Sequence, residues 1–247
     1  MFRPLLVMTL IPLQTLAITN VEEKRRASDS DGWLNTATLG FDAQSGNTKE
    51  REWNLGLNTS WQNAEHRAFG WYTRSYESVN DERTSDNTFA HLRYVRNFRA
   101  PVGQETFLQY ERDPFAELQY RFLAGLGVRF QKNWGDDQLV RQGVGAFHES
   151  IKEDNGAGQE EAQLTRLNLY THGETPLGYS HLLGTVYLQP SIDDTDDVRA
   201  LARFTLRLPL ASSTDLNWQW QTRWDSRPPQ GAEELNHKTQ LSLAIRF

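Results

Sequence analysis

The chain has 247 residues, and its 26 Lys and Arg against 32 Asp and Glu give a formal net charge of −6. That length suits one large all-β domain, or one to two ordinary domains. Only 38% of the residues are hydrophobic, and after the first segment no stretch approaches the roughly 18–20 apolar residues of a transmembrane helix. The acidic balance argues against nucleic-acid binding. The absence of Cys excludes disulfides, Cys zinc sites and Cys nucleophiles.

The first segment has the pattern of a signal peptide. Residues 1–17 read MFRPLLVMTLIPLQTLA, with one early positive charge at Arg3, an apolar run too short to span a bilayer, and the small residue Ala17 at the end. This order of charged, apolar and small residues is typical of export signals. A polar segment, 18–32, follows without periodicity. We therefore predict an exported chain whose folded domain is a β-barrel over 33–247.

From Trp33 onward the side chains alternate with a period of two, which is typical of strands with two unlike faces. Between Leu118 and Phe130, for example, apolar residues at even positions alternate with mostly polar or small residues at odd positions. The pattern predicts twelve strands separated by turn-forming sequences. Their expected ranges are 33–44, 50–61, 66–78, 87–98, 105–112, 117–130, 138–151, 162–173, 179–189, 198–208, 214–225 and 237–247.

The connections between these strands alternate in length. Starting with the first, every other connection has 4 to 11 residues, and the remaining ones have 4 to 7. Outer-membrane barrels have an even strand number, short periplasmic turns and longer outer loops. Open sheet edges are not tolerated in lipid. The predicted fold class is therefore all-β, a closed antiparallel transmembrane β-barrel of about 12 strands with up-and-down topology.

Alternation alone does not decide which face of the strands points outward, because a soluble barrel turns its apolar face inward. Aromatic residues gather near the predicted strand ends, and lipid-facing surfaces carry aromatic girdles at both rims. We expect Trp218, Trp220, Trp224 and the terminal Phe247 to face lipid. A chain that ends in an alternating strand with a terminal Phe resembles bacterial outer-membrane barrels.

Four segments together resemble a known family. They contain the turn Ser45-Gly46-Asn47-Thr48, the D-x-F-x-x-L-x-x-R spacing from Asp113 to Arg121, the pair Gly125 and Gly127, and the stretch 224–229 that ends at Pro229. They resemble the salt-induced outer-membrane proteins, known as domain of unknown function 481, from about Trp33 to Phe247. Trp224-Asp225 stands where the family suggests Tyr-Asp, which keeps an interface aromatic. The resemblance implies an outer-membrane β-barrel, and it implies no established activity.

The charged side chains of the opposite face are the candidates for the lumen lining. They are Glu111, Glu117, Arg121, Arg129, Arg199, Arg203, Arg207, Arg223, Asp225 and Arg246. Arginines recur every four residues from Arg199 to Arg207, about 13 Å apart on one face. They either pair with acids, Glu149 among them, and fill the lumen, or line a passage that attracts anions. Twelve strands fall between a filled barrel and a wide channel, so both interpretations stay open.

An enzymatic alternative is a membrane-embedded lipid hydrolase, which needs a Ser–His pair on the outward wall. The nearest candidates are His148-Glu149-Ser150, and His172 with His181, which could meet across a hairpin. The acidic loop 193–197 could bind a divalent cation, although a solvated charge run is favoured. We predict no catalytic residue, no metal and no cofactor.

The function expected from these observations is a narrow pore or a structural envelope protein of the Gram-negative outer membrane. Its expected partners are outer-membrane lipid and lipopolysaccharide, together with the barrel-assembly machinery, which would engage the C-terminal strand. A monomer is favoured, and no nucleic acid is expected. A soluble periplasmic β-barrel that binds an apolar ligand is the remaining alternative.

Overall fold

The computed structural model describes residues 31–46, 48–97, 99–135, 138–154, 158–211, 214–228 and 233–245. The predicted signal peptide and nearly all of the polar segment lie outside these residues. Twelve strands make up almost the whole described chain: β1 (Gly32–Gln44), β2 (Glu50–Gln62), β3 (His66–Val79), β4 (Glu82–Arg96), β5 (Val102–Asp113), β6 (Leu118–Trp134), β7 (Gln138–Asp154), β8 (Gln159–Leu177), β9 (Ser180–Pro190), β10 (Val198–Ala211), β11 (Thr214–Asp225) and β12 (Leu235–Ile245). The described helix is a single 3-10 turn, η2 (Pro114–Ala116), and no described helix is long and apolar enough to cross a membrane.

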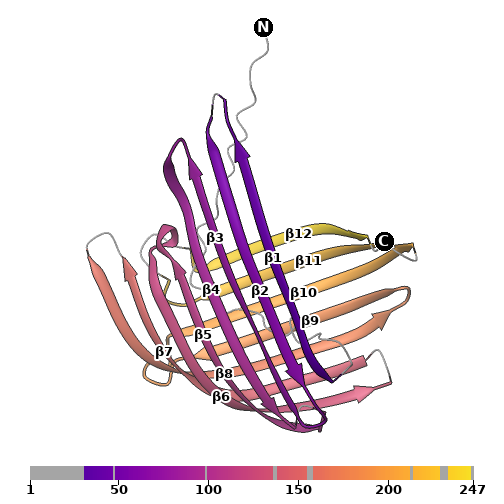
Figure 1. The fold of residues 1–247 in the computed structure, drawn as a ribbon. Helices are drawn as coiled ribbons and strands as arrows, with labels where there is room; N and C mark the ends of the chain where they lie inside the picture. Colours follow the sequence, from indigo (N-terminus) through magenta and orange to yellow (C-terminus); the bar gives the residue numbers. More distant parts are fainter. Residues whose placement is uncertain are drawn as a thin grey trace.

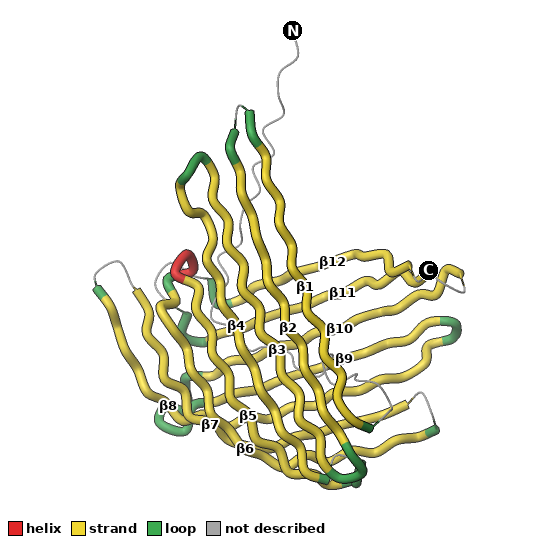
Figure 2. The backbone as a smooth tube through the Cα atoms, in the orientation of Figure 1, coloured by secondary structure: helices red, strands yellow, loops and turns green. Residues whose placement is uncertain are grey.

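The strands form one antiparallel sheet in the order β1 to β12, each paired with its neighbours in the chain. Figure 1 shows this sheet strongly curled, and Figure 2 shows the 3-10 turn between β5 and β6. The predicted strand number, antiparallel pairing and up-and-down topology are confirmed. Connections at one end of the sheet have 2 to 9 residues and those at the other end 2 to 5, so the predicted difference in loop length is present but smaller.

Closure of the sheet is where the structure differs from the prediction. Pairing registers join each strand to the next, and none joins β1 to β12 within the described residues. Both faces of β1 are therefore exposed along almost its whole length. The sheet in the structure is a curled, open one with β1 and β12 at its two free edges (Figure 1).

The apolar face of the sheet points outward and the charged face points inward. On β6 the side chain of Leu126 is 68% exposed, whereas Arg121 and Arg129 are buried. On β11, Trp218 is 50% exposed and Asp225 is buried. A soluble β-barrel has the opposite arrangement, with its apolar side chains packed inside, so this distribution is the one required of a wall that faces hydrocarbon.

A β-bulge corrects the predicted pattern at the start of β6. The register with β7 shifts between Leu118 and Tyr120, so one extra residue enters the strand and reverses the side on which the preceding side chain points. Leu118, predicted on the outward face with Phe122, is instead buried and packs against Ile151. Alternation in the sequence does not reveal such a shift, because Leu118 keeps its even position.

Aromatic rings pack together on the inner face of the sheet, about halfway along the strands, and glycines leave room for them. Trp71, His91 and Phe107 stack in sequence across β3, β4 and β5, with centroid separations of 4.6 and 5.9 Å. Phe107 on β5 then meets Phe147 on β7 at 6.1 Å across β6. This contact requires Gly125, because a Cβ there would lie 2.4 Å from the Phe107 ring. The glycine thus lets two inner rings meet over the strand between them.

Candidate functional site: the ionic network of the interior

Glu149 on β7 is the centre of a buried ionic network inside the sheet. Its carboxylate is 0% exposed and accepts hydrogen bonds from three guanidinium groups. Arg121 Nε on β6 lies at 2.5 Å, Arg166 Nε on β8 at 2.8 Å and Arg199 Nη1 on β10 at 2.9 Å. Charge-assisted bonds of this kind are the strongest hydrogen bonds that proteins form. Glu149 therefore ties three strands to β7 through one carboxylate.

Two further carboxylates balance the three arginines. Asp197, in the connection before β10, accepts a two-pronged contact from Arg166, with Nη2–Oδ2 at 2.6 Å and Nη1–Oδ1 at 3.0 Å. Asp225, at the end of β11, accepts from Arg199 Nε at 3.0 Å. The network thus contains three arginines and three carboxylates. The arginines are Arg121, Arg166 and Arg199, and the carboxylates are those of Glu149, Asp197 and Asp225. A buried group of ions is tolerated only when it is paired and hydrogen-bonded in this way.

One contact of this network crosses the interior. Arg121 and Arg166 stand on the strands beside β7, whereas Arg199 stands on β10, with β8 and β9 in between. The alternation of β10 turns Arg199 inward, and its pairing with Asp225 in the register of β10 and β11 orients the guanidinium. The Arg199–Glu149 hydrogen bond therefore passes over the inner face of β8 and β9 through the interior.

A second network crosses the interior nearer the end with the shorter connections. Glu105 on β5 accepts from Arg93 Nη1 at 2.9 Å and from the Tyr170 hydroxyl on β8 at 3.1 Å, and Arg129 Nε lies 3.9 Å from the same carboxylate. Strands β6 and β7 separate Glu105 from Tyr170 in the sheet. The two networks thus lie on the inner face near opposite ends of the strands, with the stacked aromatic rings between them.

Most of the predicted lumen residues lie on the inner face. Arg121, Arg129, Arg199 and Asp225 are buried, and the partly buried ones are Glu111, Arg203, Arg207 and Arg223. Arg203 donates to Gln221 on β11, with Nε–Oε1 at 2.8 Å. Glu117 lies outside the strands, where it is exposed and adopts a left-handed φ of 61° after the 3-10 turn. Arg246 lies outside the described residues.

The family-motif residues divide into turn and packing positions. Ser45 and Gly46 form the β1–β2 turn, and Asp113 caps the 3-10 turn by accepting from Ala116 N at 3.2 Å. Gly127, like Gly125, sits where a Cβ would be too close to a neighbour, here 2.9 Å from the Val144 carbonyl oxygen. Asn47 and Pro229 lie outside the described residues.

The aromatic residues predicted to face lipid lie on the outer face where the structure describes them. Trp218, Trp220 and Trp224 are exposed there, whereas Phe247 lies outside the described residues.

For three residues of the network, the sequence alone does not predict their place in it. Glu149 was singled out as one acidic partner among several, and Arg166 and Asp197 were not assigned to the interior. An alternation signal exists for Arg166, since Arg166 and Asn168 at even positions of β8 alternate with the apolar Leu167 and Leu169 at odd positions. No sequence signal joins Asp197 to it, because the contact depends on how the 191–197 connection folds over β8, where Ile192 N donates to Thr165 O at 2.7 Å.

The structure also places the histidine pair and the acidic loop that the sequence offers as alternative sites. His172 and His181 do not face each other, because the β8–β9 register pairs His172 with Thr185 and His181 with Pro176. In the acidic loop, Asp193 accepts from Thr165 N at 2.8 Å and Asp197 pairs with Arg166. These carboxylates hold the connection onto the sheet. Within the described residues, no group of three or more His, Asp or Glu could hold a metal ion.

The fold and interior define an up-and-down antiparallel β protein with an apolar exterior and a charged, hydrogen-bonded interior. The chain belongs to the family described as protein of unknown function, DUF481, whose profile matches residues 37–247. The resemblance seen in the sequence motifs is therefore confirmed, starting at Ala37 instead of Trp33. The family description carries no salt-induced designation.

Three solved structures are similar to the chain in fold at low sequence identity. The translocator domain of autotransporter NalP from Neisseria meningitidis has a TM-score of 0.44 and 14% identity, covering 87% of each chain. The NanC porin has a TM-score of 0.49 and 8% identity, covering 87% of this chain and 99% of that chain. The β domain of the Bordetella autotransporter BrkA has a TM-score of 0.35 and 10% identity, covering 87% and 98%. No curated protein matches the chain in sequence.

Proposed function

We propose that the chain is an outer-membrane β-barrel that serves as a structural envelope protein, with a bore occluded by its own ionic networks. The observation that carries this proposal is the Arg199–Glu149 hydrogen bond, which joins β10 to β7 through the interior at 2.9 Å. The outward apolar wall supports placement in lipid, and the export pattern of residues 1–17 supports delivery to the envelope. In this placement, the end of the barrel that carries the longer connections faces the outside of the cell.

The proposal requires that β1 and β12 pair with each other, because unpaired N–H and C=O groups cost several kcal/mol each in lipid. Two conditions select the register. The 11 residues of β12 must lie within the 13 residues of β1, and outward side chains must share one face. Leu39 and Leu241 are exposed at odd positions of the two strands, so odd residues pair with odd. Antiparallel pairing of Ala37 with Leu241 satisfies both conditions.

We expect Ala37→Cys with Leu241→Cys to form a disulfide in the membrane-inserted protein, because directly paired strand residues have Cβ atoms about 4.5–5.5 Å apart. The natural chain has no Cys, so a shift on a non-reducing gel reports this pair alone. The control is Ala37→Cys with His237→Cys, displaced by four residues or about 13 Å. Equal cross-linking of both pairs, or none of the first, contradicts the proposed seam.

A purified sample in planar bilayers should show no steady open conductance, because side-chain contacts join non-adjacent strands through the interior near both ends: the Arg199–Glu149 ion pair at one end and the Tyr170–Glu105 hydrogen bond at the other. The second candidate function is a narrow anion pore, which the partly buried Arg203, Arg207 and Arg223 on the inner face favour. That candidate predicts steady conductance with anions more permeant than cations. Such a current, sustained across voltages, overturns the occluded barrel.

Four of the six histidines make hydrogen bonds that bear on the enzymatic alternative. His66 contacts the Tyr94 hydroxyl, His91 contacts Gln109, and His172 contacts Thr185 and Glu174. On the outer face, His237 Nδ1 lies 2.8 Å from the Thr222 hydroxyl and its ring stacks on Trp220. None of these partners is a serine, so the Ser–His pair that a lipid hydrolase of the predicted kind would use is not among them.

A further inference from the structure

A cluster of three arginines surrounds one buried carboxylate on the outer face of the sheet. Asp86 on β4 is 4% exposed and accepts from Arg74 Nη2 at 3.3 Å, Arg83 Nη1 at 3.0 Å and Arg112 Nη1 at 3.2 Å. The three arginine side chains are about a third to a half exposed. One carboxylate does not neutralise three cations, so these four side chains carry a net charge of +2.

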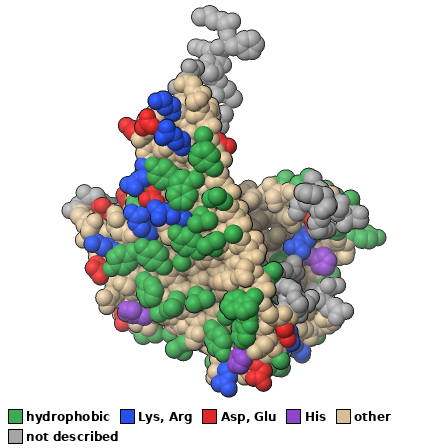
Figure 3. Space-filling view, in the orientation of Figure 1, with side chains coloured by type: hydrophobic (Ala, Val, Ile, Leu, Met, Phe, Trp, Pro, Cys, Tyr) green, Lys and Arg blue, Asp and Glu red, His purple; other side chains and the backbone are tan. Residues whose placement is uncertain are grey.

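The cluster lies on the same outward face as the apolar wall. Asp86 occupies an even position of β4, as do the exposed Leu92 and Tyr94. Aromatic rings flank it: Arg74 lies over Trp53, and Arg83 lies over Phe115, each at 5.6 Å from the ring centroid. Figure 3 shows basic side chains gathered on the upper part of this wall, beside hydrophobic ones. Aromatic and basic residues together mark the level at which a wall leaves hydrocarbon for head groups.

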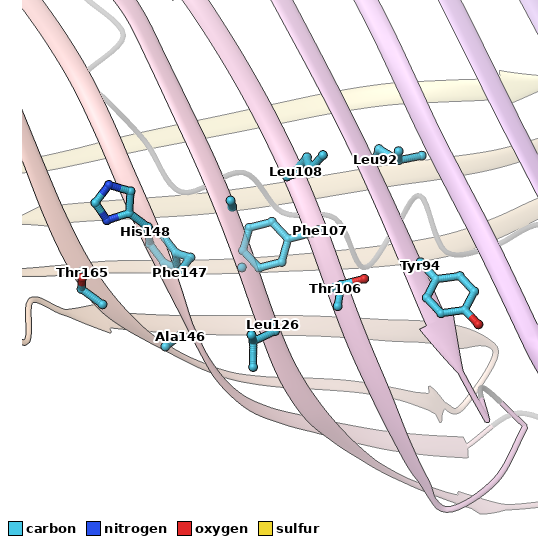
Figure 4. Close-up of a pocket in the computed structure, with 12 residues that line it drawn as sticks. Leu92, Tyr94, Thr106, Phe107, Leu108, Leu126, Ala146, Phe147, His148 and Thr165 are labelled. Carbon is cyan, nitrogen blue, oxygen red and sulfur yellow. The ribbon is translucent and has the colours of Figure 1, made fainter.

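A groove of about 650 Å³ begins below the cluster on the same wall. Figure 4 shows its lining from Leu92 on β4 to Thr165 on β8, with Leu108 and Leu126 between them and the short side chain of Ala146 near the β8 side. Leu108 and Arg112 share the outward face of β5 four residues apart, or about 13 Å along the strand. An apolar groove and a cationic cluster are thus arranged as the tail and head of one lipid molecule.

We propose that this outer-wall site binds one phosphorylated outer-leaflet lipid of the lipopolysaccharide type. Its phosphate would contact Arg74, Arg83 and Arg112, and one acyl chain would lie in the groove. Guanidinium groups match phosphate oxygens in paired, charge-assisted hydrogen bonds. Asp86 is a positioning residue, because it holds the three guanidiniums together against their mutual repulsion. The inference rests on the proposed outer-membrane location and adds a defined ligand to it.

The test is native mass spectrometry of the full chain in detergent micelles, with phosphorylated lipid A, the same lipid after phosphate removal, and inorganic phosphate as probes. We expect the phosphorylated lipid to bind wild-type protein at least about tenfold more tightly than the dephosphorylated lipid. The variant R74Q/R83Q/D86N/R112Q should lose that preference. It removes Asp86 as well, so that no unpaired carboxylate is left buried. Inorganic phosphate at the same concentration should not bind.

A second variant keeps the test decisive if the fourfold change impairs folding. Ala146→Trp fills the groove without touching the arginines, and it should weaken lipid binding by about tenfold. The matched control K49Q/R51Q/K152Q removes three other basic residues near the same end of the sheet and should bind as wild type does. Equal binding of both lipids, or unchanged binding by the fourfold variant, overturns the site. Failure of the protein to fractionate with outer membranes would instead overturn the proposed function.

Discussion

Replacing Glu149 by Gln is expected to lower the free energy of unfolding by about 3–5 kcal/mol, the cost of breaking a buried ion pair by removing one partner. Arg121, Arg166 and Arg199 keep their charges and lose the carboxylate that they share. The amide that replaces it supplies one acceptor oxygen and no charge. The measurement is a urea titration followed by tryptophan fluorescence in micelles, in which the midpoint should fall markedly.

The control for this experiment is Glu161→Gln. Glu161 is exposed and accepts one hydrogen bond, from the Tyr120 hydroxyl at 3.0 Å, so its loss should cost below about 1 kcal/mol. The double variant E149Q/R199Q should cost less than the sum of the two single changes, because both act on one contact. Additive effects, or equal effects of E149Q and E161Q, would show that the interior is wet and loosely paired.

Replacing Leu126 by Arg is expected to cost about 2–4 kcal/mol, the cost of a cation on the lipid face near the bilayer midplane. Leu126 is 68% exposed on β6. In water an exposed Leu can become Arg at almost no cost, so the direction of this change separates a lipid-facing wall from a soluble surface. The readout is the yield and urea midpoint of protein folded into lipid vesicles.

The effect should depend on depth in the bilayer. Leu177, also exposed but at the β8–β9 turn, should tolerate Leu177→Arg at a cost of about 0–1 kcal/mol. Both substitutions add the same charge to the same face, so the difference between them isolates position. Two equally mild effects would favour the soluble periplasmic barrel over the membrane barrel.

The strands could be predicted closely because alternation is a local property of the chain. Period two over 11 or more residues leaves few other structures, and the family motifs at Gly125 and Gly127 lie where the structure permits no Cβ. The same alternation places Arg121 and Arg199 on the face opposite the apolar side chains. Where a strand departs from regular pairing, as at the Leu118 bulge, the alternation misleads.

What the sequence by itself determined is the number and order of the strands and the alternation of two unlike faces, because both depend on neighbours a few residues apart. Only the tertiary structure decided that the apolar face points outward, and that Glu149, Arg166 and Asp197 meet in one network. Period two is the same for a wall turned either way. Contacts across the interior depend on register, curvature and loop folding, which bring together residues such as Glu149 and Arg199, 50 positions apart.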